Sequence, residues 1–216
     1  MRYGINTLDD LEVVGKTVLC RVDINSPIDP TSGELADVTR IKGCAPTLRE
    51  LAEAGARVVV LAHQGGDLEY HNYASTEPHA KVLSELIGRP VAFIDDVCGP
   101  AARDAVMALA DGDVLLLDNV RYCGEELTLF ENKLKLSPED QCKTLVVRKL
   151  APLAELYVCD AFAYDVFCRS TTDELSAQAH LAARPDHSAQ RAQQRGLAGA
   201  IGTQHSRNAT LRDFQP

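Results

Sequence analysis

The sequence contains no tryptophan, two methionines and few aromatic residues, which make up 5% of its 216 residues. It also lacks any run of about 18 to 20 apolar residues and any apolar segment near its first residue. Neither a transmembrane helix nor a secretory signal is therefore expected. Basic residues are not in excess, since the formal net charge is −9 at pH 7. A general nucleic-acid-binding surface, which needs positive charge, is not expected either.

The seven cysteines lack the spacing that is typical of zinc ribbons or of secreted disulfide frameworks. Their number is odd, no two are spaced as Cys-x-x-Cys, and several lie in apolar segments, where cysteine acts as a small hydrophobic residue. We therefore expect a reducing, cytoplasmic setting and no metal site. The sequence also contains neither a Walker A loop nor a Gly-x-Gly-x-x-Gly motif, the common phosphate-binding loops of nucleotide sites.

Short apolar segments alternate with segments of helical periodicity, in a chain that is 45% hydrophobic and 25% charged. Strands are predicted over residues 18–22, 56–62, 91–94, 114–117 and 155–159. Helices are predicted over 41–54, 77–87, 100–110 and from 137 to about 150. Strands this apolar, separated by helices, are typical of a parallel sheet covered on both faces. The sequence thus predicts an α/β, Rossmann-like fold of one large domain, with room for an appendage.

Polar residues follow several of the predicted strands, where open α/β sheets bind ligands. Asp23 and Asn25 alternate with apolar neighbours, so an extended backbone directs both side chains to one face. Arg40 begins the next helical segment and can supply a guanidinium for a phosphate or carboxylate. Further polar residues follow the later strands: His63, Gln64, Gly65, Gly66, Asp118, Asn119, Arg121 and Asp160. The pattern predicts a site for a small anion that also carries hydroxyl groups.

The segment 176–216 differs sharply in composition from the rest. It has no lysine and no glutamate, and it contains five arginines, two aspartates and half of the histidines. Its apolar residues are too sparse to form a core of their own. Three interpretations stay open: a disordered tail, the translation of a different reading frame, and a basic RNA-binding tail.

The sequence between Thr7 and Ser170 resembles the N-terminal, substrate-binding domain of phosphoglycerate kinase, most closely the archaeal form. The matching segments are VLCRVDINSPID, ADVTRIKGCAPTLRELAEAGARVVVLAHQGG, HAKVLSELIGRPVAFIDDVCG, GDVLLLDNVRYCGEE, VVRKLAPLAELYV and CDAFA. The resemblance implies a domain over residues 1–175 with that family's α/β fold, followed by the divergent segment 176–216.

The resemblance also implies roles for individual residues. Asp23 and Asn25 would bind the glycerate hydroxyl and carboxylate end, and Arg40 would stabilise the transferring phosphoryl group as the catalytic residue. His63 would bind substrate, together with the Gln64, Gly65 and Gly66 that follow it. Arg121 would be a ligand of the substrate phosphate. Fixed guanidinium groups suit this chemistry better than flexible ammonium groups.

The sequence departs from the family pattern at two places. The family has an arginine three residues after the histidine, where this chain has Gly66 followed by Asp67. This change is either loop drift or a weakening of phosphate binding. The arginine that follows the family's Asp-Ala-Phe motif corresponds either to Arg169, after a two-residue insertion, or to a position now occupied by Phe167.

By this resemblance the chain is expected to act in glycolysis and gluconeogenesis. The family transfers a phosphoryl group between 1,3-bisphosphoglycerate and ADP, which gives 3-phosphoglycerate and ATP. Mg-ATP and ADP bind the family's second domain, which no part of this sequence resembles, so the chain is interpreted as truncated. We expect a cytoplasmic monomer whose partner is the small-molecule substrate. A non-catalytic phosphoglycerate-binding module and a decayed remnant are the alternatives.

Overall fold

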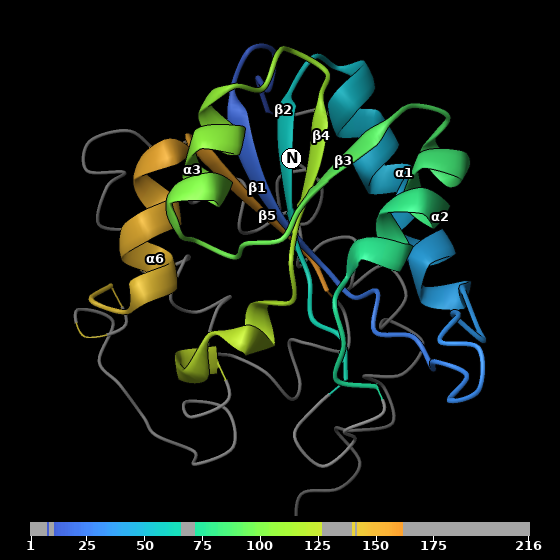
Figure 1. Cartoon of the computed structure of the whole chain (residues 1–216). Helices are drawn as coiled ribbons and strands as arrows, with labels where there is room; N and C mark the ends of the chain where they lie inside the picture. The colour runs from blue at the N-terminus through green and yellow to red at the C-terminus, as the bar shows by residue number, and fades with distance from the viewer. Residues whose placement is uncertain (1–7, 9–10, 66–71, 127–139, 141, 162–216) are drawn as a thin grey trace, which may run out of the picture.

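A five-stranded parallel β-sheet forms the centre of the computed structural model, which describes residues 8, 11–65, 72–126, 140 and 142–161. The strands lie side by side in the order β3-β4-β2-β1-β5 (Figure 1). They are β1 (Thr17–Val22), β2 (Arg57–Leu61), β3 (Val91–Ile94), β4 (Val114–Leu117) and β5 (Leu156–Asp160). The predicted α/β class with a parallel sheet is confirmed.

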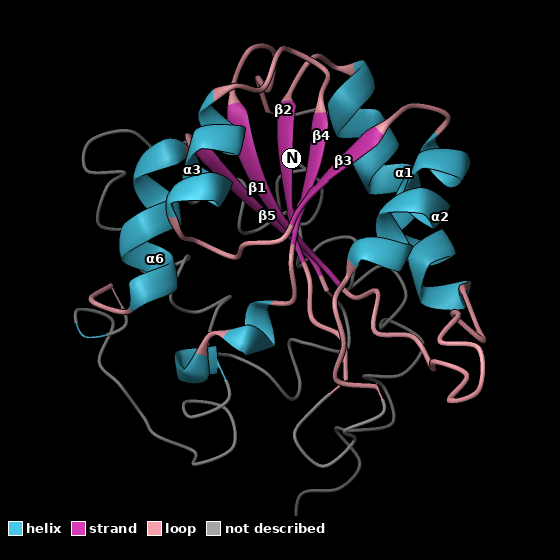
Figure 2. Ribbon diagram, in the orientation of Figure 1, coloured by secondary structure: helices cyan, strands magenta, loops and turns pink. Residues whose placement is uncertain are grey.

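Helices cover both faces of this sheet (Figure 2). Helices α1 (Thr39–Glu53) and α2 (Glu77–Ile87) contact each other on one face. Helices α3 (Pro100–Met107) and α6 (Leu145–Leu150) lie on the other face, with the short 3₁₀ helix η3 (Ala151–Leu153). No helix among the residues that the structure describes is both long and apolar enough to cross a membrane.

The two helical layers enclose two separate hydrophobic cores, and successive strand residues alternate between them. Val18 and Cys20 belong to the core under α1 and α2, whereas Leu19 belongs to the core under α3 and α6. All six residues of β1 are buried, as expected for a strand covered on both faces. Burial of each such aliphatic side chain contributes about 1.5 to 3 kcal/mol.

Most element boundaries agree with the sequence-based prediction, and the exceptions have local causes. Helix α1 starts at Thr39, two residues early, because Asp37 Oδ1 accepts a hydrogen bond from the Thr39 N–H at 2.6 Å. Helix α3 ends three residues before the predicted boundary, with Ala108 as its C-cap. The predicted helix from 137 to 150 is wrong over residues 142–144, which form a turn. Thr144 is extended there, and Glu125 Oε2 accepts from the Leu145 N–H at 2.6 Å.

Candidate functional site

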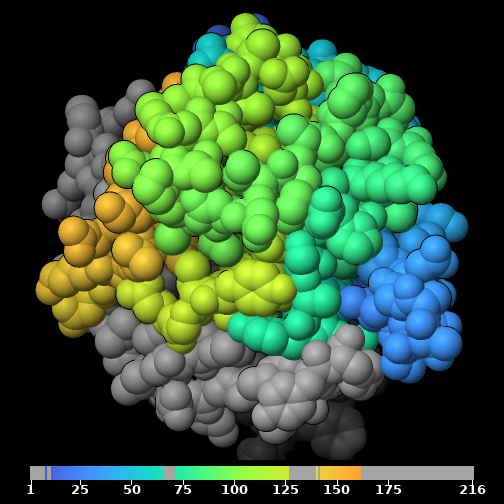
Figure 3. All heavy atoms as spheres, in the orientation of Figure 1, coloured from blue at the N-terminus to red at the C-terminus, as the bar shows by residue number. Residues whose placement is uncertain are grey.

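The loops that follow β1, β2 and β4 lie together below the sheet in Figure 1, at the carboxyl edge of the strands. Asn25 Oδ1, after β1, accepts a hydrogen bond from the Gly65 N–H, after β2, at 2.9 Å. Ile28 N–H donates to Asn72 Oδ1 at 2.9 Å. In the space-filling view the blue segment after β1 and the teal segment after β2 share a surface (Figure 3). Residues far apart in the sequence therefore form one site.

Arg40 and Asp23 form an ion pair at this edge. Arg40 Nη1 donates to both carboxylate oxygens of Asp23, at 3.0 Å and 2.8 Å. Asp23 is 12% exposed and Arg40 is 51% exposed, so the pair lies at the border between protein and solvent. Arg40 Nε and Nη2 have no hydrogen-bond partner among the described residues. A single nitrogen thus holds the carboxylate, while the rest of the guanidinium group can bind an anion.

Gln64 holds the neighbouring loops together through its buried side chain. Its Oε1 accepts from the Ser26 N–H at 2.9 Å and lies 3.0 Å from His79 Nε2. Its Nε2 donates to the carbonyl oxygens of Ser26 at 2.7 Å and Asn72 at 3.1 Å. Because these contacts use the whole amide, Gln64 can influence a ligand by positioning Ser26 and Asn72.

Asn119 plays a similar role between the loops after β2 and β4. Its Oδ1 accepts from the backbone N–H groups of Gln64 and Arg121, both at 3.1 Å. Its Nδ2 donates to the carbonyl oxygens of Gln64 at 2.7 Å and Ala74 at 2.9 Å. Asn119 also begins the 3₁₀ helix η2 (Val120–Tyr122), which contains Arg121. One buried amide therefore fixes the backbone at His63–Gln64 relative to that at Arg121.

His63, Gly65 and Arg121 meet at the end of β2. Burial lowers the pKa of His63 well below its usual value, and the nearby Arg21, Arg121 and Arg40 lower it further. The imidazole is thus neutral at pH 7. Arg121 Nη1 donates to the Gly65 carbonyl oxygen, and Tyr73 Oη donates to the Arg121 carbonyl oxygen at 2.6 Å.

The Gly65 backbone leaves no room for a side chain. Its φ is +63°, in the left-handed region, and a Cβ at this position would lie 2.2 Å from the Asn72 carbonyl oxygen. The loop after β2 therefore requires glycine here, both for its conformation and for the close approach of two backbones.

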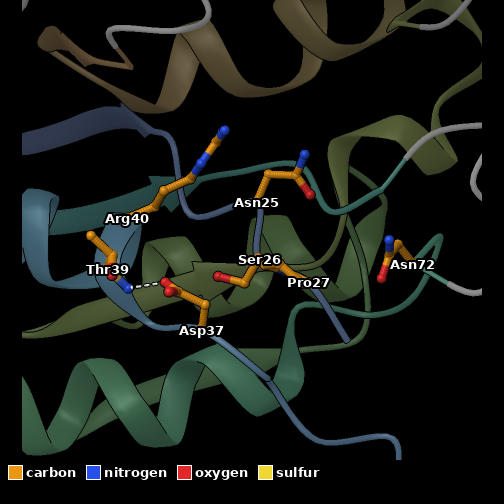
Figure 4. Close-up of a pocket in the computed structure, with 7 residues that line it drawn as sticks. All are labelled: Asn25, Ser26, Pro27, Asp37, Thr39, Arg40 and Asn72. Atoms are coloured by element: carbon orange, nitrogen blue, oxygen red, sulfur yellow. Dashed lines mark hydrogen bonds between the residues drawn. The ribbon is translucent and has the colours of Figure 1, made fainter. Parts of the chain in front are cut away.

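A pocket of about 490 Å³ opens beside the Arg40–Asp23 pair. Figure 4 shows the side chains of Arg40 and Asn25 extending to the same side of the backbone. Asp37 also lines the pocket, but its carboxylate accepts from the backbone N–H of Thr39, which lowers the pKa of Asp37. The full lining is Asn25, Ser26, Pro27, Asp37, Thr39, Arg40 and Asn72.

Seven of the nine residues predicted for the site lie at this edge of the sheet. They are Asp23, Asn25, Arg40, His63, Gln64, Gly65 and Arg121. Gly66 and Arg169 lie outside the described residues, as do Asp67 and Phe167. The pocket itself is lined by Asn25 and Arg40 from this set.

The sequence-based prediction missed several pocket residues, namely Ser26, Pro27, Asp37, Thr39 and Asn72. Of these, Ser26 and Pro27 directly follow Asn25, so the sequence offered a signal for them. Asn72 follows no strand, and no periodic pattern distinguishes it. Only the folded loop places it beside Ile28, through the hydrogen bond described above.

Asp160 ends β5 opposite Val22, one residue before Asp23 on the neighbouring strand. Burial raises the pKa of its carboxyl to about 6, and a hydrogen bond with the Thr47 side chain opposes this rise. Its buried Oδ2 has no hydrogen-bond partner in the part of the chain that the structure describes. The carboxyl therefore adds little negative charge near the site below pH 6.

Within the described ranges, no group of three or more histidine, cysteine, aspartate or glutamate side chains could hold a metal ion. A magnesium ion prefers octahedral oxygen ligands and carboxylates. The described residues do not fit such an ion.

A parallel sheet covered by helices on both faces defines an α/β domain of Rossmann-like type, and its carboxyl edge gathers arginines, an asparagine and a neutral histidine. A family model for phosphoglycerate kinase matches residues 8–181 of this sequence. The chain belongs to the phosphoglycerate kinase family.

Individual relatives agree with this assignment. The chain is 47% identical over 161 residues to phosphoglycerate kinase of Methanothermobacter thermautotrophicus, an alignment that covers 74% of this chain and 38% of the relative. It is 45% identical over 162 residues to that of Sulfurisphaera tokodaii, covering 74% and 37%. Its structure matches phosphoglycerate kinase from Pyrococcus horikoshii with a TM-score of 0.72 and 35% identity, over 80% of this chain and 40% of the other. The chain thus spans about 38% of the length of the first curated relatives.

Proposed function

We propose that the carboxyl edge of this sheet binds the phosphorylated glycerate of the phosphoglycerate kinase reaction, with Arg40 as the principal phosphate ligand. The observation that supports this most is the geometry of Arg40. One guanidinium nitrogen is held by Asp23, and the others are available beside the pocket that Asn25 also lines. This arrangement orients the guanidinium group before the ligand arrives and so limits the entropy lost on binding.

The other site residues would divide the recognition of the ligand. Asn25 Oδ1 already accepts from the Gly65 N–H. The amide nitrogen of Asn25 would therefore be the group that donates to a hydroxyl or carboxylate oxygen of the ligand. Asp23 can accept from a glycerate hydroxyl, and neutral His63 can hydrogen-bond without repelling the arginines. Arg121 adds positive charge from η2. Together these residues can bind a small anion that bears hydroxyl groups.

In the family reaction, an acyl phosphate of 1,3-bisphosphoglycerate is transferred to ADP. Charge builds up on the oxygens of the transferring group, and fixed cationic groups stabilise it. Arg40 and Arg121 are cationic side chains at this edge of the sheet, and both can provide this stabilisation. ADP and Mg-ATP are substrates that other parts of a phosphoglycerate kinase would bind.

Calorimetric titration of the chain with 3-phosphoglycerate tests the binding proposal. We expect a dissociation constant in the high micromolar range or weaker, and a loss of about 10- to 100-fold in Arg40→Ala, because a charge-assisted hydrogen bond contributes about 1.5 to 3 kcal/mol. Arg57→Ala is the matched control, since it also removes one exposed arginine but lies at the start of β2, where Arg57 pairs with Asp111. Heat equal to that of buffer dilution with the unmodified chain would overturn the proposal.

A coupled assay separates binding from phosphoryl transfer. The chain is assayed alone and with the C-terminal half of the Methanothermobacter thermautotrophicus relative supplied in trans. Activity that appears only in the mixture, and that Arg40→Ala removes, is the expected result. Binding of 3-phosphoglycerate without activity in the mixture would favour a non-catalytic binding module.

A further inference from the structure

A fully buried histidine, His79, contacts the loops of the anion site from helix α2. Its Nε2 lies 3.0 Å from Oε1 of Gln64, whose buried amide joins those loops. Neither His79 nor Gln64 lines the pocket itself. The histidine is therefore connected to the pocket through the Gln64 amide.

The end of β4 holds the start of α2 in place. The Thr76 N–H donates to Asp118 Oδ1 at 2.9 Å, and Thr76 Oγ1 donates to the Leu117 carbonyl oxygen at 3.0 Å. The His79 N–H then donates to the Thr76 carbonyl oxygen at 3.0 Å. One turn further along α2, Leu83 is fully buried in the core under α1 and α2. The imidazole is thus carried by backbone that is fixed to the sheet.

The hydrogen-bond partners place the proton of the His79 ring on Nε2. Gln64 Nε2 faces the carbonyl oxygens of Ser26 and Asn72, which can only accept, so the amide oxygen is the atom that faces His79. The Ser26 N–H donates to the same oxygen at 2.9 Å. An imidazole nitrogen opposite an acceptor must carry a proton. Burial lowers the pKa of His79 to about 4, so at pH 7 the ring is neutral and Nδ1 carries no proton.

The Gln64 amide connects two sides of the pocket. It bonds both the N–H and the carbonyl oxygen of Ser26, in the loop after β1, and the carbonyl oxygen of Asn72, before α2. Both residues line the pocket, and Ser26 lies between Arg40 and Asn72 in the view of Figure 4. The terminal torsion of a glutamine side chain is soft, so an amide can rotate about it. The contact with His79 opposes this rotation.

We propose that His79 is a positioning residue of the anion site and that it holds Ser26 and Asn72 in their binding positions through the Gln64 amide. This inference rests on the proposed function, since it concerns binding of 3-phosphoglycerate in the same pocket. Without the His79 N–H, Gln64 Oε1 still accepts from Ser26, so the loops stay joined while the amide loses one of its contacts. Ligand binding must then order the loops, which lowers affinity.

A merely structural role for His79 would give a different pattern. A side chain that only fills space can be replaced by leucine without an effect on the ligand, whereas a positioning residue needs its N–H donor. Leu83 offers a matched control, because it is a fully buried residue of the same helix that contacts the core under α1 and α2. Leu83→Val should lower stability and leave the pocket unchanged.

NMR of the ¹⁵N-labelled, full-length chain at pH 7 tests the proton assignment without a ligand. The ring signals of His79 are identified as those absent from His79→Gln, and we expect a proton on Nε2 and none on Nδ1. The same samples report hydrogen exchange of the Ser26 N–H, which bonds the Gln64 amide. This exchange should be about 3- to 10-fold faster in His79→Leu than in the unmodified chain or in Leu83→Val.

Calorimetric titration with 3-phosphoglycerate tests the effect on the site. His79→Leu removes the N–H donor, whereas the amide nitrogen of His79→Gln can take the place of the imidazole Nε2. We expect the dissociation constant to rise about 3- to 10-fold in His79→Leu, the effect of one net hydrogen bond, and by less than about 2-fold in His79→Gln and Leu83→Val. In a Gln64→Leu background, His79→Leu should add no further loss, because both residues act through one amide.

Three outcomes would overturn the inference. They are a proton on Nδ1 of His79, unchanged binding in His79→Leu, and equal losses in His79→Leu and His79→Gln. If the unmodified chain gives no heat with 3-phosphoglycerate, the proposed function fails, and the ring proton and the Ser26 exchange rate still decide whether His79 positions the loops. The ring proton of the unmodified chain decides the matter even where His79→Leu fails to fold.

Discussion

The Asp160 carboxyl gives the most quantitative prediction about stability. It is half-buried at the end of β5, and partial burial raises its pKa to about 6 because it disfavours the charged form. A free aspartate has a pKa of about 3.9. The difference of about two units corresponds to about 3 kcal/mol, since one unit is equal to 1.36 kcal/mol.

The sign of the effect follows from proton binding. Between about pH 4 and pH 6 the folded chain keeps the Asp160 proton that the unfolded chain has already lost. This group therefore makes the free energy of unfolding fall as the pH rises through that window, and its effect is constant above it. Asp160→Asn removes the charge and keeps the shape, so it should stabilise the chain by about 1 to 3 kcal/mol at pH 7.5 and leave it nearly unchanged at pH 4.

Urea unfolding followed by circular dichroism at pH 4, 5, 6 and 7.5 measures this difference. Asp111→Asn is a suitable control, because Asp111 has an exposed carboxylate at the opposite edge of the sheet, in an ion pair with Arg57. A difference between Asp160→Asn and the unmodified chain that does not change with pH would refute the reasoning. A variant that is less stable at pH 7.5 would refute it as well.

Further predictions concern His79, Gly65 and Asn119. Burial lowers the pKa of His79 to about 4, so its contribution to stability is present above pH 6.5 and is lost as the pH falls towards 4. Urea unfolding checks this, because the free energy of unfolding should change less steeply with pH in His79→Gln than in the unmodified chain. Gly65→Ala should lower the free energy of unfolding by at least about 2 kcal/mol, because its Cβ would clash with Asn72. Gly33→Ala should lower it by about 1 kcal/mol, because Gly33 has φ +72° but no atom within 4 Å of the added Cβ. Equal losses for the two variants would contradict the steric explanation. Asn119→Ala should cost about 2 to 4 kcal/mol in the same assay, because it leaves buried backbone groups without partners, and a loss below 0.5 kcal/mol would count against its proposed role.

Much of the fold was predictable because its strands are strongly apolar and its helices are periodic. The segments at β3, β4 and α2 have the predicted bounds, since glycine, proline or aspartate residues border them. The order of the strands was not predicted, because local periodicity says nothing about which strands are neighbours. The start of α6 was missed because Glu125, 20 residues away, caps the Leu145 N–H.

The site was predictable to the extent that polar residues directly follow strands. Asp23, Asn25, His63, Gly65 and Arg121 were found in this way, because parallel strands bring their carboxyl ends to one edge. The network through which Gln64 and Asn119 join three loops could not be predicted. Sequence position does not show which backbone groups a buried amide contacts.

The central claim is that 3-phosphoglycerate binds at the carboxyl edge of the sheet, and two-dimensional NMR of the ¹⁵N-labelled chain tests it most directly. Titration with 3-phosphoglycerate should shift the backbone signals of Asn25, Thr39 and Gly65, whereas those of Gly55 and Gly112, at the opposite edge, should stay in place. Shifts that are equal at both edges, or that stay unchanged in Arg40→Ala, would contradict the account.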